Sequence, residues 1–180
     1  IIGHVKDVTF PVILNAGESF SCQDTSTTAP TKLAGSIISA DKPIAVTVSS
    51  SGLINGGCTS TIADQITNSN HAGNDFVITK SETGNDKVFI LATVNSTSIT
   101  LTNGTSTVST LINTGETYSA NITQELTYIK STKPVYVIHV TGHGCKLSGA
   151  QVPHFYCAGT YSTSFTRTSA DSFAVNVFTR

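Results

Sequence analysis

A pattern that occurs twice is the feature that most constrains the fold of this chain. Its clearer copy runs from residue 111 to 153, and an earlier copy runs from residue 13 to 66. The spacing between the copies changes only between matching blocks, as loop insertions and deletions would produce. The blocks match in the same order, as residues 14–21 with 112–119, 38–46 with 129–137, and 63–66 with 149–152. We interpret the pattern as an old internal duplication.

Each copy predicts a turn followed by strands. The Asn-x-Gly-Glu sequences at residues 15–18 and 113–116 are turn signals, because glycine tolerates positive φ and asparagine tolerates the left-handed region. Pro43 and Pro134 then each precede a run of alternating β-branched residues. Since proline has no amide hydrogen to give to a ladder, we expect both prolines at the first residue of a strand.

Short strands are expected along the rest of the chain, and no stretch of a dozen residues shows a helical stripe. The run at residues 87–94 is the most apolar and predicts a central strand. Asn103-Gly104 predicts the turn of a hairpin. Residues 50–74 are expected to form a long irregular loop. The other expected strands are residues 7–14, 33–38, 76–80, 98–102, 105–112, 163–166 and 173–179.

These signals predict an all-β fold, an antiparallel β-sandwich built from two pseudo-repeats with no substantial helix. The first pseudo-repeat covers residues 1–80 and the second residues 81–180, together forming one compact unit. The second has a full hairpin ahead of its turn, whereas the first has only one strand there. Either upstream strands were clipped from the first pseudo-repeat, or another element pairs the edge that they would cover. The first residues, Ile-Ile-Gly-His, indicate a mature product or an excised piece.

Composition excludes several function classes. Charged residues make up 12% of the 180 residues, net charge is −1, and serine and threonine are abundant. No basic block is present, so the electrostatic footprint of a nucleic-acid-binding protein is missing. The longest apolar runs fall far short of the roughly 20 residues that a membrane-spanning helix needs. We therefore expect neither a nucleic-acid partner nor a membrane span.

The four cysteines indicate an extracellular or cell-surface location. Their number is even, and a β chain rich in serine and threonine favours disulfides formed in an oxidising compartment. Three pairings are possible, and we favour Cys145 with Cys157 and Cys22 with Cys58. Each would stabilise the fold by about 3 to 4 kcal/mol. No Cys-x-x-Cys or His-x-x-x-His pair predicts a zinc site, and neither a metal nor a cofactor is expected.

Few residues suggest catalysis. His143 and Cys145 lie two apart and could form a nucleophile pair, but a structural half-cystine after a strand is the simpler interpretation. His139 occupies a strand position where we expect a partly buried, hydrogen-bonded ring. Asp75 and Asp86 are expected to be turn residues, because the carboxylates lack the spacing of a calcium loop. His4, His71 and His154 are scattered. We find no catalytic motif and predict that the chain is not an enzyme.

Several motifs together resemble the IgGFc-binding protein N-terminal domain family. They include residues 98–102 (SITLT), Thr114-Gly115-Glu116, residues 129–137 (IKSTKPVYV) and residues 142–145 (GHGC). The resemblance continues through residues 146–153 and 157–160 and covers roughly residues 17–178, with 63–66 fitting earlier. The chain departs from the family pattern at His139, where glutamine is expected. The resemblance implies an extracellular β module of mucin-like Fc-binding proteins and bacterial surface proteins, and brings no catalytic residues.

The leading hypothesis is therefore a non-catalytic extracellular or cell-surface module for adhesion or protein–protein interaction. Sheet edges and the segments 50–74 and 142–160 would form the binding surface. The partners would be other surface proteins or glycans, and the sheet edges would also permit self-association. One alternative is a structural subunit of a head-to-tail extracellular filament or surface layer, in which a neighbour's strand fills the gap before Asp7. Another is a carbohydrate-binding module, although the chain has no tryptophan.

Overall fold

The computed structural model describes residues 8–23, 33, 35–55, 58–81, 84–143 and 146–157, together with the single positions 162, 164, 166, 170 and 177. Within these residues every regular element is a β-strand except one 3-10 turn, Ser69–His71. All strand pairs are antiparallel. The predicted all-β class is confirmed, while the sandwich and its pseudo-repeats stay predictions.

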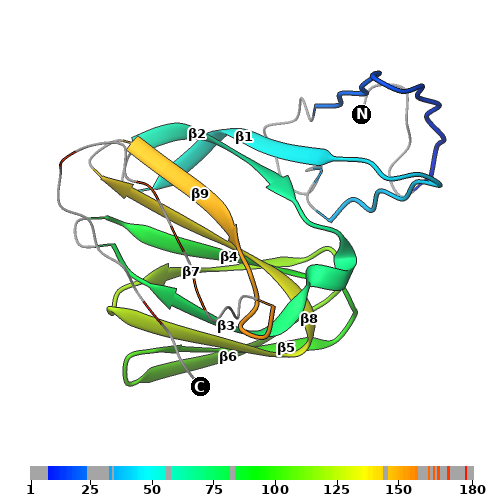
Figure 1. Ribbon diagram of the computed structural model, residues 1–180. Helices are drawn as coiled ribbons and strands as arrows, with labels where there is room; N and C mark the ends of the chain where they lie inside the picture. The colour runs from blue at the N-terminus through cyan, green and yellow to red at the C-terminus, as the bar shows by residue number, and fades with distance from the viewer. Residues whose placement is uncertain are drawn as a thin grey trace.

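The strands follow one another with short connections (Figure 1). They form a two-stranded ladder of β1 and β2 and a seven-stranded sheet of the others. Their bounds are β1 Val46–Asn55, β2 Cys58–Ile66, β3 Gly73–Thr79, β4 Asp86–Ala92, β5 Thr97–Asn103, β6 Ser106–Ile112, β7 Thr117–Ile122, β8 Leu126–His143 and β9 Lys146–Val152.

The long strand β8 connects the sheet. Its first half pairs with β3 on one side and β5 on the other, and its second half pairs with β4 and β9. Pro134 lies between the two halves, inside β8, so the expectation that it opens a strand is wrong. A residue without an amide hydrogen fits this position, because here the strand leaves one set of partners for the other.

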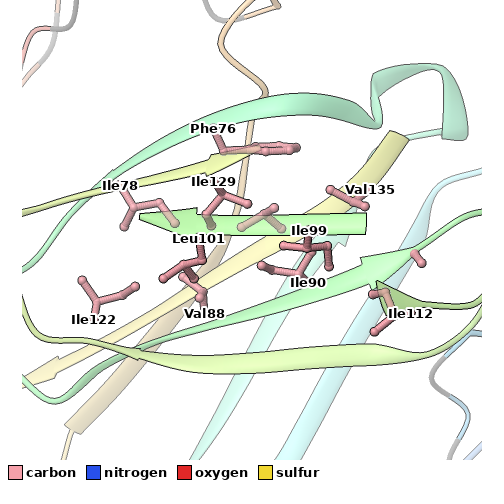
Figure 2. Packing of buried hydrophobic residues seen from close by; sticks show 12 residues of the cluster. Phe76, Ile78, Val88, Ile90, Ile99, Leu101, Ile112, Ile122, Ile129 and Val135 are labelled. Carbon is pink, nitrogen blue, oxygen red and sulfur yellow. The ribbon is translucent and has the colours of Figure 1, made fainter. Parts of the chain in front are cut away.

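Alternation along the strands produces a single core. In β4 every second residue is buried, and the same period holds in β5. The buried side chains form one cluster, in which Phe76 and Ile78 of β3 face aliphatic residues of β4 and β5 (Figure 2). The expected central position of the most apolar run is confirmed, because β4 has a paired strand on each side.

The two Asn-x-Gly-Glu sequences form the same turn. In the first, the Asn15 amide donates to Glu18 Oε2 at 2.8 Å, and in the second the Asn113 amide donates to Glu116 Oε2 at 2.7 Å. The Glu18 and Glu116 amides donate back to the asparagine carbonyls. The glycine of each turn has positive φ, +85° and +80°. The shared Asn-x-Gly-Glu pattern therefore specifies the same turn conformation at both places.

The hairpins that follow the prolines also share a register. Val46 lies opposite Ile66 in β1 and β2, and Val137 lies opposite Val152 in β8 and β9. These are equivalent positions in the matched blocks. The two hairpins meet along β2 and β9, where the Gln151 amide donates to Asp64 Oδ2 at 2.7 Å. Figure 1 shows β1 and β2 beside β9.

Several expected elements differ from the structure. Residues 8–14 and 35–38 form no strand, although both were expected to. The expected loop at residues 50–74 instead holds the end of β1 and all of β2. The hairpin turn lies one residue later than expected, with Asn103 paired to Ser106 and Gly104 first in the loop at φ +64°. The strands expected at 163–166 and 173–179 fall mainly outside the described residues.

Candidate functional site

A buried carboxylate is the centre of a polar cluster that joins four hydrogen bonds. Asp86, the first residue of β4, has a side chain with no exposed surface. Ser81 donates from its amide to Oδ2 at 2.9 Å and from its hydroxyl to Oδ1 at 2.6 Å. Thr141 of β8 donates to Oδ1 at 3.0 Å, and His139 Nε2 lies 2.9 Å from Oδ2. The cluster joins the turn before β4 to the second half of β8.

These hydrogen bonds leave the carboxylate little capacity for another ligand. A carboxylate offers about four lone-pair positions, and four protein groups occupy them here. Burial raises the pKa of the Asp86 carboxyl, but the hydrogen bonds from Ser81, Thr141 and His139 outweigh it, so the pKa lies below its ordinary value. Asp86 is therefore an ionised acceptor that holds structure together.

A hollow of about 400 Å³ lies beside this cluster, bordered by Lys80, Asn85, Asn121 and Thr123. The geometry does not assemble a nucleophile there. Ser81 donates its hydroxyl to Asp86 rather than to His139, whereas an activated serine needs a base as its hydrogen-bond partner. His139 confirms the expectation of a partly buried, hydrogen-bonded ring.

The other histidines and carboxylates considered as candidate site residues have separate partners in the structure. His71 Nδ1 bonds to Asn68 in the 3-10 turn, and the ring of His154 packs edge-on against Phe76. Asp75 lies in β3 and accepts a hydrogen bond from Tyr128, so its assignment as a turn residue is wrong. His4 and the His143 side chain lie outside the described residues. Across the described part of the chain, no group of three or more His, Cys, Asp or Glu could hold a metal.

The cysteine predictions stay open. Cys22 and Cys157 are exposed and carry free thiols in the structure. Cys145 and the side chain of Cys58, their predicted partners, lie outside the described residues. The two disulfides therefore stay predictions.

Strand β6 lies at an end of the seven-stranded sheet and offers an open edge to a partner. Strand β6 pairs with β5 alone among the described strands, so the outward side of its backbone has no ladder. Val108 and Leu111 are large apolar side chains on β6, and both are exposed. An edge of this kind can pair with a strand from another molecule.

The outer face of the same strands is rich in hydroxyl groups. Thr100 Oγ1 lies 3.2 Å from Ser109 Oγ, and Thr102 Oγ1 lies 3.2 Å from Thr107 Oγ1, so the cross-strand pairs of β5 and β6 are linked. Tyr128 of β8 lies opposite Thr102 in the register and shares its face. The face combines ordered hydroxyls with one aromatic ring.

Sequence reasoning missed two side-chain partnerships. Asp86 and Thr141, like Asp75 and Tyr128, lie more than fifty residues apart, and only the pairing of β3 and β4 with β8 brings them together. The period-two pattern predicted strands at β3 and β4, but no local signal gave their register with β8.

Comparison with known proteins gives one match. A family model described as IgGFc binding protein matches residues 2–178, nearly the whole chain. Neither a curated protein nor a solved structure matches. Among the described residues, the structure contains no helix with the length and apolar character to cross a membrane.

Proposed function

The chain belongs to the IgGFc-binding protein family, and from that premise we propose that it is a non-catalytic extracellular module for adhesion or protein–protein interaction. The family is one of extracellular protein-binding modules. We assign to this chain a partner protein on its sheet edge, with immunoglobulin Fc as the first partner to test.

The open edge of β6 carries this proposal. Backbone amides and carbonyls along an unpaired edge can form a ladder with an added strand, while neighbouring apolar side chains supply affinity. Leu111 and Val108 lie on that strand and are exposed. In many proteins, lysine or proline on an edge strand prevents it from pairing with another chain, and residues 106–112 contain neither.

The polar cluster at Asp86 supports a binding role over a catalytic one. Its four hydrogen-bond donors come from the protein itself, and the Ser81 hydroxyl has no histidine as its partner. A general acid or base must have a proton position open to the substrate. The cluster instead ties β4 to β8, and so supports the sheet whose edge is β6.

The proposal is tested by measuring binding of the full chain to immobilised immunoglobulin Fc and, separately, Fab. We expect binding to Fc, and we expect Leu111→Lys to weaken it at least tenfold because lysine on an edge opposes strand pairing. Val8→Lys is the matched control, since Val8 is about as exposed but lies far from β6 in the sequence. Equal loss in both variants, or no binding to either fragment, would contradict the proposal.

The hydroxyl-rich face supports glycan binding as a second candidate. Tyr128 shares a face with the threonines of β5 and β6, and an aromatic ring beside hydroxyls can contact a sugar. Screening the chain against a panel of immobilised glycans tests this candidate. A glycan that binds the wild type and loses at least tenfold affinity with Tyr128→Ala would support it, whereas a panel without any binder would contradict it.

A further inference from the structure

The first copy of the repeated pattern exposes the apolar side chains that the second copy buries. Ile38 is 59% exposed, whereas its counterpart Ile129 is 0% exposed. Ile44 is 53% exposed and its counterpart Val135 0%. Leu14 is 45% exposed, against 7% for Ile112. The same kind of residue is present at each position, so the difference lies in what surrounds it.

Neighbouring strands account for the burial in the second copy. Ile129 of β8 lies opposite Phe76 of β3 and Leu101 of β5. Val135 lies opposite Ala92 of β4, and Ile112 lies opposite Thr97 of β5. Among the described residues, residues 36–45 form no strand, and no described strand pairs with them.

Two local elements of the first copy nevertheless match those of the second. Its Asn-x-Gly-Glu turn shares with the second the bond from the asparagine amide to the glutamate carboxylate and the bond from the glutamate amide to the asparagine carbonyl, and the β1–β2 hairpin has the same register as β8–β9. Residues 36–45 therefore match the sequence of a strand, and no described strand pairs with them. In the second copy, the neighbouring strands present aliphatic side chains at alternate positions of β4 and β5.

We propose that residues 36–48 are a docking site for two strands of another protein that pair antiparallel with this segment, each with aliphatic residues at alternate positions as in β4 and β5. The partner would form a backbone ladder with the segment and cover Ile38 and Ile44. This assignment rests on the proposed protein-binding function and adds a second surface, separate from β6.

The face that the partner covers follows from the equivalence of the copies. Ile37 corresponds to Tyr128, which lies on the outer face of β8 and is exposed. Ile38 corresponds to Ile129, which points into the core. When residues 36–48 pair as a strand, successive side chains point to opposite faces. Ile38 then faces the partner and Ile37 faces solvent. A substitution at Ile38 should therefore weaken binding of the partner, and one at Ile37 should not.

The test uses the full chain and a synthetic peptide with the sequence of residues 86–103, which covers β4 and β5. Amide hydrogen exchange is measured with and without the peptide, and a peptide of scrambled order is the control. We expect added protection at residues 36–48 with no change at residues 117–143. Protection confined to the second copy, or none at all, would overturn the proposal.

Two variants define the face. The double substitution Ile38→Asp with Ile44→Asp is expected to lower peptide affinity at least tenfold, whereas Ile37→Asp leaves it within twofold. Equal losses would overturn the proposed orientation. Protection of residues 36–48 that rises with protein concentration in the absence of peptide would make a second copy of this chain the occupant and would overturn the proposed partner. Binding to Fc at β6 is measured in the same variants. A chain that binds Fc but not the peptide contradicts only the docking site at residues 36–48, whereas a chain that does not bind Fc contradicts the proposed function.

Discussion

The Asp86 side chain is a single residue on which four hydrogen bonds converge, and its replacement by asparagine has a definite expected cost. The amide group of asparagine has one acceptor oxygen, so it cannot accept all four donors. We expect Asp86→Asn to lower the free energy of unfolding by about 2 to 3 kcal/mol at neutral pH. Urea unfolding followed by circular dichroism measures it, with Asp41→Asn at an exposed carboxylate as the control. Equal midpoints for the two variants would contradict the structural role of Asp86.

The same residue predicts a dependence on pH. The pKa of Asp86 lies below its ordinary value of 3.8 in the folded protein, because hydrogen bonds favour the charged form more than burial disfavours it. The unfolded chain therefore binds more protons in acid, and the stabilisation is present above the unfolded pKa and lost as pH falls through the folded pKa. The stability difference between wild type and Asp86→Asn should accordingly shrink as pH falls below about 4. A difference constant from pH 7 to 2 would contradict this expectation.

Tyr128 is expected to titrate abnormally. The hydrogen bond to Asp75, with further contributions from burial and from the carboxylate charge, raises the pKa of Tyr128 to about 12. We expect Asp75→Asn to lower this pKa toward the ordinary value of 10.0. Ultraviolet absorbance of tyrosinate between pH 9 and 13 measures the change. Asp64→Asn is the control, since Asp64 accepts hydrogen bonds from the Gln65 and Gln151 amides. An unchanged titration in Asp75→Asn would contradict the assignment.

At the scale of the element, the two matching turns differ in what they connect. The Gly115 amide donates to the Ala92 carbonyl, and the Ala92 amide donates to the Glu116 carbonyl, so the second turn extends the ladder between β4 and β7. The first turn has the same internal hydrogen bonds, but residues 8–23 around it form no strand. The turns thus provide one local conformation in two tertiary contexts.

This contrast predicts that replacing the turn glycine by alanine will change the free energy of unfolding at one turn and not at the other. Alanine at either turn glycine must adopt positive φ, which costs about 1 kcal/mol. We expect Gly115→Ala to lower the free energy of unfolding by that amount, because its turn belongs to the cooperative sheet. Gly17→Ala should leave the urea midpoint unchanged, because its turn lies outside the sheet. A larger effect at Gly17 than at Gly115 would contradict this interpretation.

Strand signals in the sequence succeeded where tertiary neighbours were present. The expected strands at residues 76–80, 87–94, 98–102 and 105–112 coincide with β3 to β6, because alternation and turn chemistry agree there with the packing. Residues 8–14 and 35–38 carry similar apolar patterns but form no strand, since a strand is stabilised by cross-strand partners rather than by its own sequence. The misassigned loop at 50–74 shows the converse, because β2 is polar and rich in threonine yet pairs with β1.

For the whole molecule, the cysteine pairing is the main covalent prediction. If Cys145 pairs with Cys157 and Cys22 with Cys58, the denatured and unreduced protein should show no reactive thiol. Reduction should then lower stability by about 3 kcal/mol or more for each disulfide. A thiol-reactive dye and mass spectrometry with and without reductant measure both quantities. Four reactive thiols before reduction would contradict the pairing.

The repeated pattern, which we interpret as a duplication, was found in the sequence because turns and strand starts leave local signatures. The contact between the β1–β2 and β8–β9 hairpins was not predicted. The Gln151 backbone amide of β9 donates to Asp64 of β2, and the Gln151 side-chain amide donates to Thr67. This contact depends on polar groups that meet across the edges of two hairpins. The sequence revealed neither candidate site, for the same reason. An open edge at β6 follows from strand order, and the Asp86 cluster follows from register, neither of which a single sequence specifies.

Strand β8 also fixes when this protein can fold during synthesis. It is the shared partner of β3, β4 and β5, which do not pair with one another. A ribosome makes these three strands well before residue 143, so their apolar faces remain uncovered until β8 has emerged. Proteolysis of stalled nascent chains ending before and after β8 would measure the delay. A polypeptide whose sheet stays open until β8 has emerged is a suitable substrate for export machinery that accepts only unfolded chains.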